Sequence, residues 1–227
     1  MGLLALIAAG SAFAEPPASF PDANSPFYNL CEEDGNCGIK GASDGILFGS
    51  FGVGLGTSIT FTVTDGIENG FQPWPLLGYV LAEGGNYGLT ELVKRTVQRP
   101  RPYTWSDNYG YYSEHVRDDG ARSFFSGHTS HTAANLFYAA TELDLHLPKE
   151  KRGWAIGAYA FAATGTVTVG ALRVKGGYHY WTDVGTGALV GTAFGVLLPR
   201  AIRWRPGKVE VEASIAPDGS IQIRGVW

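Results

Sequence analysis

Residues 153–199 read GWAIGAYAFAATGTVTVGALRVKGGYHYWTDVGTGALVGTAFGVLLP, two long apolar stretches around a short segment rich in basic and aromatic residues. Both stretches, 153–172 and 181–199, are uncharged over most of their length and rich in Ala, Gly and Val. This composition predicts helices that are buried on most sides. The chain therefore ends its core with two helices, and residues 173–180 connect them.

Three further segments are predicted to be helical. Residues 45–64 carry no charge, but half or more of them are Gly, Ser or Thr, so either a bilayer span or a buried bundle helix fits. Residues 76–98 form a helix that ends near residue 99, because Pro100 and Pro102 remove backbone donors. Ser126 is a good N-cap for a helix that runs to about His146. The sequence thus predicts an all-α bundle.

Membrane spans are the alternative for the apolar segments. The mean hydropathy of −0.02 is low for a protein that crosses a membrane several times. We therefore expect a soluble or peripheral protein, with possible contact to a membrane surface, in preference to an integral one.

Both ends of the chain differ from this core. Residues 1–14 resemble a secretory signal, with a small-x-small pattern before Glu15, and predict export to the periplasm or cell envelope. Residues 15–44 are expected to be an irregular arm, in which Cys31 and Cys37 form a disulfide. Residues 45–203 make the helical domain, and the alternating pattern of residues 204–227 predicts a β-hairpin tail.

Composition narrows the class of protein. The 227 residues suffice for one substantial domain, and 44% apolar with 13% aromatic residues excludes wholesale disorder. A net charge of −4 gives no basic excess for binding nucleic acid. Many of the lysines and arginines nevertheless lie in or beside three short sequence clusters, described below. Such local positive charge suits a small anionic ligand.

The first two clusters can surround an anion. Lys94 and Arg101 lie seven residues apart, two turns if the helix continues that far. Ser126, Gly127 and His128 lie where a helix begins, and the unpaired amides of a helix start attract phosphate. Each cluster alone also fits a solvated helix end or an ordinary N-cap.

The third cluster is the most specific. Arg173 can bind two phosphate oxygens with its planar guanidinium. His179 precedes Asp183 by four residues, so we expect the carboxylate to accept a hydrogen bond from the imidazole Nδ1 and leave Nε2 as a nucleophile. A capping aspartate and a buried histidine are the alternative.

The clusters KRTVQRPRP, FSGH and RVKGGYHYWTD together resemble those of the type 2 phosphatidic acid phosphatase and vanadium haloperoxidase superfamily. The resemblance implies an all-α bundle of the acid phosphatase/haloperoxidase type and catalysis without a metal or other cofactor. It implies that His179 is the nucleophile that becomes phosphorylated, that His128 is the general acid, and that Asp183 orients His179. The phosphate-binding residues would be Lys94, Arg101, Ser126, Gly127 and Arg173.

Two positions depart from the family pattern. Phe125 stands where the family usually has Pro, and Leu172 stands where it usually has Ser. The leading hypothesis is a phosphatase acting on phosphomonoesters or on lipid phosphates and pyrophosphates. The alternatives are a vanadate-dependent haloperoxidase and a non-catalytic envelope protein that binds phosphate or lipid headgroups. The sequence leaves the oligomeric state open.

Overall fold

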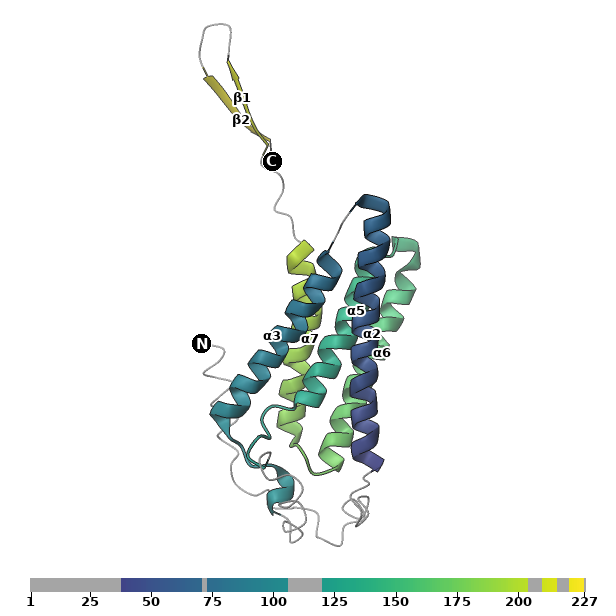
Figure 1. Cartoon of the computed structure of the whole chain (residues 1–227), viewed down its shortest axis with the longest axis vertical. Coiled ribbons are helices and arrows are strands. Elements are labelled where there is room, and N and C mark those ends of the chain that lie inside the picture. The colour runs from purple at the N-terminus through teal and green to yellow at the C-terminus, as the bar shows by residue number, and fades with distance from the viewer. Residues whose placement is uncertain (1–37, 71–72, 106–119, 204–209, 216–220, 227) are drawn as a thin grey trace.

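The computed structural model describes residues 38–70, 73–105, 120–203, 210–215 and 221–226. Within these ranges, five long helices run side by side as a bundle (Figure 1). They are α2 (Gly38–Asn69), α3 (Trp74–Val97), α5 (Gly127–His146), α6 (Arg152–Lys175) and α7 (Trp181–Arg203), with short 3-10 turns η1 (Pro102–Trp105) and η2 (Lys149–Lys151). The all-α prediction for the bundle is confirmed.

The helix boundaries agree with the sequence in part. Helix α3 ends at Val97, and Gln98 takes a left-handed conformation at φ 48° just before the prolines that were expected to stop it. Helix α2 begins at Gly38, so residues 38–44, which were expected to be irregular, are helical. Helix α7 continues past Pro199 to Arg203, although this proline has no N–H to donate to the carbonyl four residues earlier.

Helix α5 lies at the centre of the bundle and contacts α2, α3, α6 and α7 (Figure 1). Its contact with α7 depends on glycines spaced four residues apart. A Cβ atom on Gly191 would lie 2.0 Å from the carbonyl oxygen of Ser130, and one on Gly195 would lie 2.6 Å from that of Ala134. The two backbones therefore touch directly, as in the small-residue packing of helices in membranes.

The outer surface of the bundle is apolar. Leu189 and Phe161 expose 75% and 64% of their surface. In the described part of the chain, three helices are long and apolar enough to cross a membrane, over Gly38–Glu68, Lys149–Lys175 and Trp181–Arg203. The protein is therefore membrane-associated, since a bilayer covers such faces.

The prediction that residues 153–172 and 181–199 are buried on most sides is wrong. Only 28% and 22% of the most apolar windows of these two helices are buried. Small residues make their contacts inside the bundle, and the large apolar side chains point outward. Burial and exposure to lipid favour the same composition, so composition alone did not separate them.

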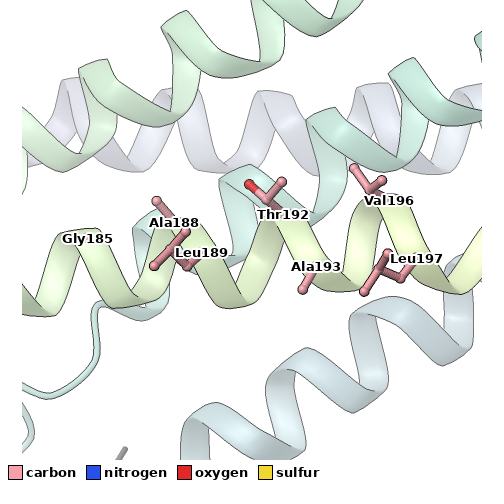
Figure 2. A pocket seen from close by; sticks show the side chains of 7 residues that line it. All are labelled: Gly185, Ala188, Leu189, Thr192, Ala193, Val196 and Leu197. Atoms are coloured by element: carbon pink, nitrogen blue, oxygen red, sulfur yellow. The ribbon is translucent and has the colours of Figure 1, made fainter. Parts of the chain in front are cut away.

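One groove of about 600 Å³ lies along α7 (Figure 2). Its lining is mostly apolar and carries no charge: Gly185, Ala188, Leu189, Thr192, Ala193, Val196 and Leu197. The groove belongs to the apolar exterior and offers nothing that could bind an anion.

The C-terminal part contains strands β1 (Glu210–Ile215) and β2 (Ile221–Val226), which pair antiparallel with Glu210 opposite Val226. Residues 216–220 between them lie outside the described residues, so the hairpin tail as a unit stays a prediction. The predicted signal segment 1–14 and the Cys31–Cys37 disulfide also lie outside the described residues.

Candidate active site

One end of the bundle collects the three sequence clusters. Helices α2, α5 and α7 begin at this end, and α3 and α6 finish there (Figure 1). Lys94 lies in the last turn of α3, His128 in the first turn of α5, and Arg173 in the last turn of α6. The antiparallel course of the helices thus brings together residues that are up to 79 positions apart in the printed sequence.

His179 lies in the short connection between α6 and α7 and is 1% exposed. Its Nδ1–H donates to the backbone carbonyl oxygen of Ser123 at 2.8 Å. A carbonyl can only accept, so Nδ1 carries the proton and the neutral ring keeps a lone pair on Nε2. The tautomer needed for nucleophilic attack is therefore fixed by the backbone.

Asp183 does not accept the hydrogen bond that the sequence predicted. Its Oδ2 lies 3.6 Å from His179 Nδ1, beyond hydrogen-bond reach. The carboxylate is occupied elsewhere, because Arg99 Nη1 donates to Oδ1 at 2.6 Å and the Ser123 hydroxyl donates to Oδ2 at 2.5 Å. The backbone N–H of Tyr180 also donates to Oδ2, at 2.9 Å. Asp183 thus ties together the segments that surround His179.

Arg99 is a buried residue to which the sequence analysis assigned no role. Its guanidinium also donates to the Thr182 hydroxyl at 2.8 Å and lies 4.0 Å above the centre of the Tyr180 ring. The side chains of Arg99 and Asp183 are 3% and 0% exposed. The only signal in the sequence is that Arg99 precedes proline in the same run as Arg101.

Arg101 and Arg173 provide buried positive charge. Both guanidinium groups lie over the Tyr178 ring, at 5.9 and 4.1 Å from its centre. Arg101 Nη1 also donates to the Tyr178 carbonyl at 3.5 Å. Because α3 ends at Val97, Arg101 reaches the site from the following segment and not along a continued helix.

The start of α5 is closely packed and lies beside Lys94. Ser126 is the N-cap, fully buried, with its Oγ accepting from the Thr129 backbone N–H at 3.4 Å. A Cβ atom on Gly127 would lie 3.3 Å from Lys94 Nζ. Glycine therefore leaves room for the lysine ammonium beside the helix start.

The charges act together on His179. Burial lowers the pKa of His179 well below its ordinary value of 6.5, and the positive charges of Arg101, Arg173, Lys94 and His128 lower it further. A Coulomb interaction weakens with distance, so cations that lower this pKa lie on the same side of the bundle as His179. The ring stays neutral in mild acid and keeps its nucleophilic lone pair.

His131 and Phe125 make their contacts inside the bundle. His131 bonds Glu83 and approaches Asn86 inside the bundle. Phe125 is completely buried and packs with Val93 and Phe124. The phenylalanine that replaces the usual proline therefore contributes to core packing.

Residues 75–206 match the family model described as the PAP2 superfamily. The chain belongs to the PAP2 superfamily. A relative, mouse phospholipid phosphatase 1, is 26% identical over 145 residues, which are 53% of this chain and 49% of that protein. The chain thus spans about half the length of this curated relative.

A solved PAP2 structure shares the fold. It is described as the first transmembrane PAP2 type phosphatidylglycerolphosphate phosphatase from Bacillus subtilis, and the superposition has a TM-score of 0.54. The match covers 89% of this chain and 96% of the other at 20% sequence identity. At that identity the likeness establishes the PAP2 bundle and nothing about the substrate.

Proposed function

We propose that this PAP2 chain is a metal-independent phosphatase that hydrolyses phosphorylated lipids through a phosphohistidine at His179. The observation that carries the proposal is the fixed tautomer of His179, whose Nδ1–H donates to the Ser123 carbonyl. The positive charges of Arg101, Arg173 and Lys94 lower the pKa of His179 and support this role. A neutral nucleophile within a cationic site is what attack on a phosphate ester requires.

The proposed reaction needs His179, His128 and one water molecule. His179 Nε2 attacks phosphorus, the bond to the leaving oxygen breaks, and that oxygen takes a proton from His128. Water then attacks the phosphohistidine while His128 accepts a proton from it. Inorganic phosphate leaves, and the His179 imidazole is restored.

Positive side chains replace a metal in this scheme. Negative charge on the phosphoryl oxygens is neutralised by Lys94, Arg101 and Arg173, and arginine can bind two oxygens at once. Arg99 and Asp183 do not face the phosphate in this scheme. They hold the segment on which His179 lies.

Three observations support a lipid as substrate. The outer faces of α2, α6 and α7 are apolar, and the site lies at one end of the bundle. A phosphate could therefore react at the membrane surface while acyl chains stay in hydrocarbon. The names of the two relatives, phospholipid phosphatase 1 and phosphatidylglycerolphosphate phosphatase, agree with this class. An exported site facing the outside of the cell is part of the same proposal.

The test uses purified protein in detergent with phosphatidic acid and phosphatidylglycerolphosphate as substrates. His179→Ala should lower kcat roughly 10⁴-fold or more, as removal of a nucleophile does. A chelator should leave the wild-type rate unchanged. Labelled substrate should give an acid-labile, alkali-stable phosphoprotein in the wild type and none in His179→Ala. Full activity in that variant, or loss of activity with the chelator, contradicts the proposal.

A further inference from the structure

Asp44 contacts the site from a helix that holds none of the three sequence clusters. It lies in the second turn of α2, and its Oδ1 accepts a hydrogen bond from His128 Nε2 at 2.8 Å. The same oxygen is 3.7 Å from Arg173 Nη1, and the neighbouring Ser43 hydroxyl accepts from that Nη1 at 3.4 Å. The first turns of α2 thus touch both the general acid and a phosphate-binding arginine of the proposed reaction.

We propose that Asp44 is a positioning residue for His128, holding its Nε2–H so that Nδ1 donates the proton to the leaving oxygen. The inference rests on the proposed function. The hydrogen bond orients the ring, because rotation of His128 away from α2 would break it. It also favours the doubly protonated ring, since a carboxylate beside one nitrogen stabilises the imidazolium.

The surroundings of His128 oppose its protonation, so the stabilisation of the imidazolium by Asp44 matters. Burial, and after it the charge of Arg173, outweigh every group that raises the pKa of His128, so that its net value is about 4 with Asp44 in place. The hydrogen bond and charge of Asp44 act in the opposite direction and raise it. A general acid must be protonated when substrate is bound, and the Asp44 carboxylate adds to the negative charge that a bound phosphate brings. Without Asp44, burial and the positive charges of Arg173 and Lys94 would lower the pKa of His128 further, and less of the ring would be protonated.

A second role for the same contact leads to different behaviour. In this second role the Asp44 carboxylate competes with phosphate for His128 and Arg173, both of which it contacts. Removing the carboxylate would then tighten phosphate binding and leave turnover unchanged or faster. The positioning role predicts slower turnover, in a manner that depends on the leaving group.

The leaving group separates these roles. A lipid phosphate expels an alkoxide that needs a proton, whereas p-nitrophenyl phosphate expels an anion that is stable near neutral pH. Asp44→Asn should lower kcat about 10- to 100-fold on phosphatidic acid, part of the 10²–10⁴-fold that general acid catalysis supplies. On p-nitrophenyl phosphate the same variant should change kcat less than about 3-fold, because little acid catalysis is needed.

Two further variants sharpen the measurement. Asp44→Glu should recover part of the lost rate on phosphatidic acid, since it restores a carboxylate. Asp65 is a matched control, because it lies on the same helix and its Oδ2 bonds His146 Nε2 at 3.0 Å at the other end of the bundle. Asp65→Asn should leave the ratio of the two kcat values unchanged. The alkaline limb of the kcat profile on phosphatidic acid should move to lower pH in Asp44→Asn only.

The outcomes are distinct. Equal losses on both substrates, no loss on either, or a faster rate in Asp44→Asn would overturn the positioning role. If wild-type protein forms the phosphohistidine while Asp44→Asn behaves as wild type, only this inference fails. If His179→Ala keeps its activity, the proposed function fails and this inference fails with it.

Discussion

Replacing Gly191 by alanine tests the packing that holds the site. The new Cβ would lie 2.0 Å from the carbonyl oxygen and 2.8 Å from the carbonyl carbon of Ser130, whereas ordinary contact begins at 3.4 Å. The obstacle is backbone of α5 and not a flexible side chain, so α7 must move away by more than an ångström. Overpacking of this kind costs about 1–3 kcal/mol, and we expect the upper half of that range.

Gly185 is the matched control because it lies on the same helix with nothing within 4 Å of a Cβ atom there. Both substitutions gain about 1 kcal/mol of helix propensity, so the difference between the variants isolates the clash. Thermal unfolding in one detergent should place the Tm of Gly191→Ala about 4–10 °C below that of Gly185→Ala. Its kcat should also fall, since α7 carries Asp183. Equal Tm values would refute direct contact between the α5 and α7 backbones.

Three other substitutions or conditions test the site. Arg99→Ala leaves the Asp183 carboxylate buried without its guanidinium and should destabilise the protein by about 3–5 kcal/mol, measured as a loss of Tm; a Tm equal to wild type would show that the pair is dispensable. Lys94→Ala should raise KM for the phosphate ester by roughly 10-fold, whereas Arg95→Ala, whose side chain is 68% exposed, should not; equal effects would mean that Lys94 does not face the substrate. The fold lowers the pKa of His179, so only the unfolded chain takes up this proton as the pH falls through 6.5, and stability should decline below that pH. The acidic limb of kcat/KM should lie below pH 6.5, and a limb at or above that value would contradict the cationic surroundings.

Local signals predicted much of this fold and of the candidate site. Prolines that end α3 and the N-cap Ser126 act over a few residues, so their effect can be predicted without knowing the fold. The cluster residues Lys94, Arg101, His128 and Arg173 follow from spacing and from the family resemblance, and the helices place them at one end of the bundle.

The contacts that fix the site could not be predicted in the same way. Arg99 and Asp183 are 84 residues apart, as are Asp44 and His128, and no sequence period links such pairs. The predicted hydrogen bond from His179 to Asp183 was wrong. The four-residue spacing suggested this pair, but in the folded chain the Asp183 carboxylate accepts from Arg99 and Ser123.

The apolar exterior was missed for another reason. A mean hydropathy of −0.02 averages the helices with the polar ends of the chain, whereas windows within three helices reach 1.3–1.6. The role of Asp44 was also missed. Asp44 directly precedes the uncharged stretch 45–64 and belongs to the segment that was expected to be irregular.

The hydrogen bond from His179 to a backbone oxygen has a consequence for mutagenesis. No substitution of one amino acid for another deletes the backbone carbonyl of Ser123. Alanine scanning at this position would therefore test only the serine hydroxyl. Weakening the acceptor requires an altered main chain, such as an ester or a thioamide introduced at that linkage by chemical synthesis. The carbonyl that sets the tautomer of His179 therefore cannot be tested by ordinary site-directed mutagenesis.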